Sequence, residues 1–276
     1  TLLVGFLSCE ENESPIPDQV VLPELTAGSA DFSNYVAVGA SFTAGFSDGA
    51  LFTAAQQNSF PSILAKEFAK AGGGNFTQPL MNDNTGGMGV ETMPVAEYRL
   101  IFNGSAPQRL NEFLAGIGAP VPPITTDASV NLSSTFNNVG VPGAKSFHVT
   151  FPGYGSLNPY FGRMATSAST TMLGDALSQN PTFFTLSELG GNDVLAYATS
   201  GGIGMDQTGN INPAAYGFND ITDPNVFADV FSGIVSSLTA TGAKGVVTNV
   251  PYITDLPYFT TVPNNALVLD AATAAQ

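Results

Sequence analysis

The chain has 276 residues, a formal net charge of −15, one Cys, one His and no Trp, and 43% of its residues are hydrophobic. That hydrophobic content excludes global disorder, and so acidic a surface would repel a phosphate backbone, so we expect no nucleic-acid partner. A single Cys excludes an internal disulfide, one Cys with one His cannot build a Cys/His zinc site, and a charged fraction of only 11% favours an exported protein.

The N-terminal segment combines an apolar run with the only Cys of the chain. Residues 2–8 are seven apolar or small residues, too few to span a bilayer, which needs about 20. Ser8 directly before Cys9 resembles the lipobox of bacterial lipoproteins, in which the Cys becomes the lipidated N-terminus. The acidic residues after Cys9 resemble the surface-export signal of Bacteroidetes lipoproteins. The alternative is that Cys9 is an ordinary small apolar residue.

These features predict a signal-peptide remnant at 1–9, a flexible tether at 10–31 and one domain at 32–276. We expect an outer-membrane or cell-surface lipoprotein anchored through Cys9, with a periplasm-facing orientation left open. The last residues, 265–276, have the pattern of a helix that meets no Gly or Pro stop signal, so we expect a fragment whose domain is incomplete at its C-terminus.

The first half of the domain alternates short apolar runs with a helix and a long polar stretch. Residues 35–38 are β-branched or aromatic and predict a buried strand, and Pro61 stands in the first turn of a helix expected at 62–71. Residues 72–133 are rich in Gly and Pro, which indicates a loop-rich insertion, with a helix expected at 107–114. A second strand is expected at 136–141.

The second half repeats helix, turn and apolar strand. Helices are expected at 167–178 and 225–241, where apolar residues recur at helical spacing. Strands are expected at 182–186 and 245–250, both as buried runs. This alternation predicts an α/β fold with a parallel sheet and covering helices.

Three of the predicted strands are followed by segments that could carry chemistry, since functional residues of open α/β sheets gather at the carboxyl ends of strands. Ser41 lies on a Gly-flanked turn after the first strand, Gly140 ends the second, and Asn192 and Asp193 follow the third. A Ser hydroxyl, a Gly N–H and an Asn amide together supply a nucleophile and donors for an oxyanion, the arrangement that acyl transfer needs.

The segments 39–45, 138–143 and 190–193 resemble, in order, the first three blocks of the SGNH (GDSL-type) hydrolases. The resemblance runs from about residue 35 to 250 and implies a flavodoxin-like three-layer α/β/α fold and hydrolysis of carboxylic esters without metal or cofactor. It also implies that Ser41 is the nucleophile and that the N–H groups of Ser41 and Gly140 and the Asn192 amide form the oxyanion hole. Asp193 is expected to support the loop rather than to act in catalysis.

Two departures from the family pattern count against activity. Ala40 stands where the family has Asp, and the Asp-x-x-His block that supplies the base is missing, so we expect that block, with the His that takes the proton of Ser41, to lie beyond Gln276. His148 is expected to be structural, because nothing in the sequence places it beside Ser41. One alternative is a non-catalytic surface lipoprotein that binds glycan or another ligand on the same scaffold. A second is that the 276 residues are themselves the mature product and nearly inert.

Individual residues also have structural interpretations. Ser41 could cap a helix, and Asn192 and Asp193 could form a turn. Tyr154, Tyr160 and Phe161 could line a substrate pocket or simply pack in a loop. Lipid esters, acetylated sugars and phospholipids all stay open as substrates, and the oligomeric state is not readable from the sequence.

Overall fold

The computed structural model describes residues 25–91, 93–250, 252–261 and 271–274. Cys9, most of the expected tether and most of the expected C-terminal helix therefore lie outside the described residues. Within the described part of the chain, no helix combines the length and the apolar character that crossing a bilayer requires.

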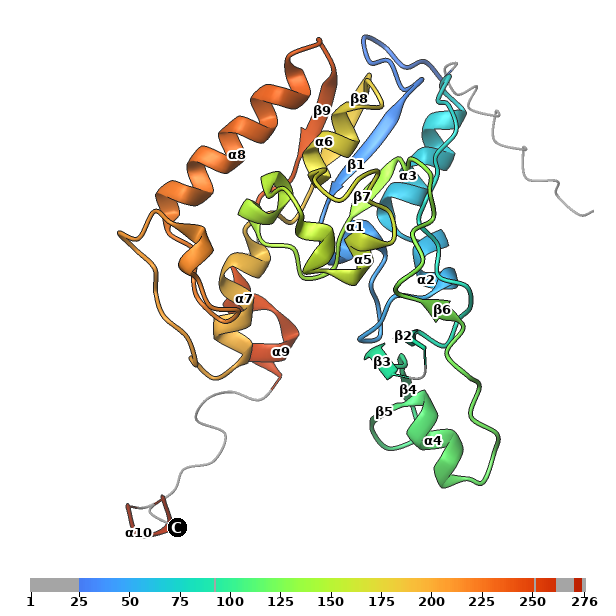
Figure 1. Ribbon diagram of the computed structural model, residues 1–276, viewed down its shortest axis with the longest axis vertical. Coiled ribbons are helices and arrows are strands. Elements are labelled where there is room, and N and C mark those ends of the chain that lie inside the picture. The colour runs from blue at the N-terminus through green and yellow to red at the C-terminus, as the bar shows by residue number, and fades with distance from the viewer. Residues whose placement is uncertain (1–24, 92, 251, 262–270, 275–276) are drawn as a thin grey trace, which may run out of the picture.

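The centre of the molecule is a four-stranded parallel sheet, as predicted (Figure 1). Its strand order is β7 (Asn138–Gly140), β1 (Tyr35–Gly39), β8 (Phe183–Leu186) and β9 (Lys244–Val247). Gly39 pairs with Gly140 on one side of β1, and Val38 pairs with Leu186 on the other. The carboxyl ends of β1, β7 and β8 therefore meet at one edge of the sheet.

Helices cover both faces of the sheet because successive side chains of a strand point to opposite faces. Tyr35, Ala37 and Phe183 pack with α3 (Phe60–Ala69) on one face. On the other face, the larger cluster joins side chains of β1 and β8 to α6 (Met172–Leu177) and α8 (Pro224–Thr239). The arrangement is compatible with a three-layer α/β fold (Figure 1).

Capping side chains set where the three helices begin. Ser59 accepts from the Ser62 N–H at the start of α3, and Thr171 accepts from the Gly174 N–H at the start of α6. Asp223 accepts from two N–H groups in the first turn of α8. The helix expected at 167–178 is therefore shorter than predicted, because Thr171 caps it four residues after its expected start.

Strand β9 corrects one prediction. Residues 245–250 are expected to form a buried strand, but all four residues of β9 are exposed, with Val246 52% and Val247 41% accessible. The reason is position, since β9 pairs only with β8 and forms an edge of the described sheet. An apolar run does not distinguish an edge strand from a central one.

The insertion at 72–133 holds more regular structure than its Gly and Pro content indicates. Met88–Val90 (β2) pairs with Met93–Ala96 (β3) and Thr126–Asp127 (β6). Leu100–Phe102 (β4) pairs with Pro107–Arg109 (β5), so the helix expected from 107 begins only at Leu110, as α4 (Leu110–Gly116). These elements lie beyond one end of the central sheet (Figure 1).

The remaining described elements are short. They are α1 (Ser41–Ala44), α2 (Thr53–Gln57), η1 (Ser146–Thr150), η2 (Tyr154–Ser156), α5 (Pro159–Gly162), α7 (Gly191–Thr199), η3 (Pro213–Ala215), η4 (Ile253–Asp255), α9 (Pro257–Thr260) and α10 (Ala271–Ala274), where η marks a 3₁₀-helix.

Candidate functional site

The three segments that resemble the hydrolase blocks lie together in the structure. They follow β1, β7 and β8, which are neighbours in the parallel sheet, so all three leave it at the same edge. Ser41 opens α1 directly after β1, and Asn192 lies in the first turn of α7 after β8. The edge of the sheet thus brings the loops together even though they are far apart in sequence.

Ser41 is half-buried at the start of α1, and its side chain does not cap the helix. Its carbonyl accepts from the Phe46 N–H at 2.8 Å. Among the described residues, neither the N–H nor the Oγ of Ser41 has a hydrogen-bond partner. A hydroxyl and an N–H that are free on the same turn suit a nucleophile better than a helix cap.

Glu188 is a residue of the site that sequence reasoning missed. It follows β8, and its carboxylate accepts from the N–H groups of Ala40, Phe42 and Thr43, each at 2.7 Å. Burial raises the pKa of Glu188, while these backbone hydrogen bonds act in the opposite direction. An acidic residue at the carboxyl end of a buried parallel strand was the available signal.

Gly140 is placed at the site, but its N–H is already used. That N–H donates to Asn138 Oδ1 at 2.9 Å, while Asn138 Nδ2 donates to the Thr43 carbonyl at 2.7 Å. A Cβ at position 140 would come within 2.3 Å of the Ala44 nitrogen. The structure therefore gives Gly140 a packing role, since the missing side chain lets α1 lie directly on β7.

Asn192 and Asp193 tie the third loop to the second. Asn192 Nδ2 donates to the Ala144 carbonyl at 2.9 Å, and its other amide hydrogen has no partner among the described residues. Asp193 is buried and accepts from the N–H and the hydroxyl of Ser146 at 2.9 and 2.6 Å. Asp193 thus fixes the loop after β8 against the loop after β7, and the Asn192 amide adds a further hydrogen bond between the same two loops.

His148 lies in η1 and is held in place from two sides. Its Nδ1 accepts from the Lys145 N–H at 3.1 Å, and its ring stacks on Tyr154 with 4.4 Å between ring centroids. Burial lowers the pKa of His148 to about 4, so the ring is neutral at pH 7. An imidazole whose acceptor nitrogen is occupied within its own helix is poorly suited to take the proton of Ser41.

The low pKa of His148 predicts a loss of stability in acid. Because the folded pKa of about 4 lies below the ordinary value of 6.5, the unfolded chain binds more protons between these pH values. The contribution of the neutral His148 ring to the free energy of unfolding is complete above pH 6.5. It is lost as the pH falls towards 4, which lowers the free energy of unfolding by about 1–3 kcal/mol after allowance for partial exposure.

Urea unfolding of the protein and of a His148→Asn variant at pH 7 and pH 4.5 measures this contribution. Both proteins weaken as their carboxylates protonate, so the difference between the two pH dependences isolates the imidazole. We expect the wild-type protein to lose more free energy of unfolding than the variant. Equal losses would show that His148 titrates normally in the folded state.

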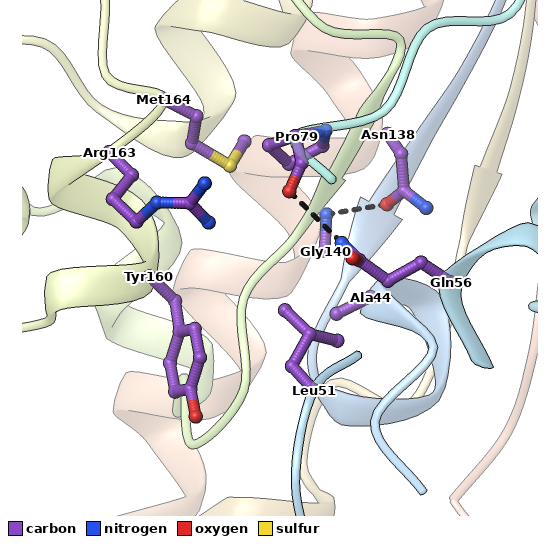
Figure 2. A pocket seen from close by; sticks show the side chains of 9 residues that line it. All are labelled: Ala44, Leu51, Gln56, Pro79, Asn138, Gly140, Tyr160, Arg163 and Met164. Carbon is purple, nitrogen blue, oxygen red and sulfur yellow. Dashed lines mark hydrogen bonds between the residues drawn. The ribbon is translucent and has the colours of Figure 1, made fainter. Parts of the chain in front are cut away.

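A small cavity lies beside Gly140 (Figure 2). Its volume is about 10 Å³, close to the space that one water molecule requires, so it cannot hold an ester. Figure 2 shows Arg163 and Tyr160 on one side of this cavity and Gly140 on the other. Burial raises the pKa of Tyr160 to about 12 and lowers that of Arg163. Tyr154 and Phe161 are buried in the core, and Tyr160, which lines this small cavity, packs against them.

A larger open groove runs beside α1, with a mainly apolar wall that also includes Ser47, Asn58 and Ser59. Its volume is about 480 Å³, within the usual range of ligand sites, roughly 300–1,000 Å³. Phe42, which directly follows Ser41 and is 67% exposed, forms part of its wall. Further wall residues are Phe46, Phe52 and Phe60. The groove therefore begins at the residue that follows Ser41.

Within the described residues, no group of three or more His, Cys, Asp or Glu side chains is arranged to hold a metal ion. The polar groups that the structure gathers on the Ser41 turn are backbone amides and the Glu188 carboxylate, while the Asn192 side chain binds the loop after β7. Comparison of the chain with family models, curated proteins and solved structures finds no match.

Proposed function

We propose that this protein is a serine hydrolase of the SGNH class that cleaves carboxylic esters, with Ser41 as the nucleophile. The observation that carries the proposal is the meeting of three strand ends at one sheet edge, with the Oγ and N–H of Ser41 both without a partner among the described residues and Asn192 on the loop after the neighbouring strand β8. The four-stranded parallel sheet with helices on both faces supports the flavodoxin-like fold of that class.

In the proposed reaction, Ser41 Oγ attacks the ester carbonyl carbon while its proton passes to a general base. The Ser41 N–H and the second hydrogen of the Asn192 amide stabilise the oxyanion that forms. Collapse of the intermediate breaks the bond to the alkoxide, which leaves with the proton, and water then releases the acid from Ser41. Gly140 joins the oxyanion hole only if its N–H exchanges Asn138 Oδ1 for the substrate oxygen.

Labelling with a fluorophosphonate probe tests the nucleophile. Full-length protein should be labelled covalently, and Ser41→Ala should lose the label completely because no other hydroxyl is proposed to attack. Ser47→Ala, which removes a hydroxyl from the wall of the neighbouring groove, is the matched control and should still be labelled. Equal labelling of the wild-type protein and Ser41→Ala would refute the assignment.

Absence of any label on the wild-type protein would favour the other candidate function, a non-catalytic surface lipoprotein that binds a glycan or another ligand. The structural observation on its side is Glu188, which places a carboxylate on three of the N–H groups around Ser41.

For either function we propose export and lipid attachment at Cys9, on the strength of the apolar run and Ser8 that precede it.

A further inference from the structure

The turn that carries Ser41 has N–H groups that its own sequence cannot satisfy. The first N–H groups of a helix have no partner within it, and they are commonly capped by a polar side chain at the preceding residue. Here that residue is Ala40, which has no oxygen to offer. The acceptor comes instead from across the sheet, because Glu188 follows the neighbouring strand β8.

Glu188 uses both carboxylate oxygens on this turn. Oε1 accepts from the Ala40 and Thr43 N–H groups, and Oε2 accepts from the Phe42 N–H, all at 2.7 Å. The N–H groups on both sides of Ser41 are therefore held by one side chain. Of the four N–H groups from 40 to 43, the carboxylate leaves free only that of Ser41.

The backbone around Glu188 holds this carboxylate against the Ser41 turn. Glu188 has a φ of +57°, a left-handed conformation that costs a non-Gly residue about 1–3 kcal/mol. Its N–H donates to Thr248 Oγ1 at 3.2 Å, and its carbonyl accepts from Gly191 at 3.1 Å. Gly190 follows with a φ of +101°, where a Cβ would come within 2.9 Å of Val250. Contacts on several sides thus hold the residue in a strained position.

We propose that Glu188 is a positioning residue for the reaction at Ser41. It clamps the turn on both sides of the nucleophile and leaves the Ser41 N–H as the donor that this turn presents to the substrate oxygen. The inference rests on the proposed function, because a donor and a nucleophile have this meaning only if Ser41 attacks an ester.

Glu188 has two opposing effects on the rate of reaction at Ser41: its hydrogen bonds position the turn, and its negative charge disfavours the oxyanion. Because these effects have opposite signs, the proposal is testable. A carboxylate close to a developing oxyanion repels it, so removal of the charge alone would accelerate the reaction. Loss of the clamp would slow it, since small displacements of a nucleophile lower the rate by up to about 100-fold. Glu188→Gln removes the charge and replaces one acceptor oxygen with an NH₂ group that faces N–H donors.

The test measures fluorophosphonate labelling of full-length protein at several probe concentrations, which separates the maximal rate of labelling from the affinity for the probe. We expect Glu188→Gln to lower the maximal rate about 10–100-fold, with little change in probe affinity. Glu188→Asp keeps both acceptor oxygens on a shorter chain and should recover part of the rate. Glu91→Gln is the matched control, because Glu91 is an exposed glutamate that also has a left-handed φ, +55°.

Urea unfolding of each variant checks that the rates are compared between folded proteins. If Ser41 is labelled and Glu188→Gln reacts at the wild-type rate or faster, the positioning role is refuted and the hydrolase assignment stands. If the wild-type protein is not labelled at Ser41, the proposed function and this inference both fail.

Discussion

Gly140→Ala should destabilise the protein by about 3 kcal/mol, the upper part of the range for a side chain forced into a packed interior. The added Cβ would come within 2.3 Å of the Ala44 nitrogen and 2.6 Å of the Thr43 carbonyl carbon. Both are backbone atoms, so a rotamer change cannot relieve the overlap, and α1 must move away from β7. Because α1 begins at Ser41, the same movement displaces the proposed nucleophile.

Urea unfolding monitored by circular dichroism measures this effect, and Gly233→Ala provides the control. Gly233 is exposed within α8 and has open space where its Cβ would stand. Alanine there should stabilise the protein by about 0.5–1 kcal/mol, because it favours the helix. If Gly140→Ala instead unfolds at the wild-type urea concentration, β7 and α1 are not packed as closely as the structure shows.

Asp193→Ala should cost about 3 kcal/mol, because it leaves two buried donors without an acceptor. These donors are the N–H and the hydroxyl of Ser146, a residue with no exposed surface. Lys145 adds to the loss, since its ammonium group is also buried and the Asp193 charge helps to keep it protonated. The second and third loops of the site would then lose their main polar connection.

Asp193→Asn separates the hydrogen bonds from the charge. An amide still offers one oxygen to the Ser146 N–H, so we expect this variant to lose about half as much free energy of unfolding as Asp193→Ala. Asp229→Ala, at an exposed position of α8, is the control and should stay within about 0.5 kcal/mol of the wild-type protein. Equal unfolding midpoints for Asp193→Ala and Asp229→Ala would contradict the role assigned to Asp193.

The central sheet was predictable because its strands are short apolar runs bounded by turn-forming residues. Residues 35–38 and 182–186 predict β1 and β8 almost to the residue, and the order of helices and strands predicts that they are parallel. The exposure of β9 was not predictable, because it depends on which strand lies beside it. The strands of the insertion were missed because each has only two to four residues, too few for a pattern.

The site was predictable in its positions but not in its hydrogen bonds. Glycine-flanked turns after three strands indicate where Ser41, Gly140 and Asn192 lie, because parallel strands end at one edge. What each group binds depends on where side chains point and on which segments the fold brings together. Glu188 reaches the Ser41 turn across 146 positions, and Asn138 takes up the Gly140 N–H by a local turn of its side chain. No periodic pattern in the sequence predicts the contact of Glu188 or the hydrogen bond of Asn138.

The insertion at 72–133 is held differently at its base and at its tip, and this difference has a consequence for its dynamics. Buried Arg163 donates to the Leu80 carbonyl, Gln56 binds Pro79 and Met81, and Asn131 donates to two carbonyls of the segment around α5. Amide hydrogens at both ends of the insertion should therefore exchange slowly with solvent, together with the core. Those of α4, none of whose residues is buried, should exchange faster, so the insertion opens locally at α4 before it opens at its ends.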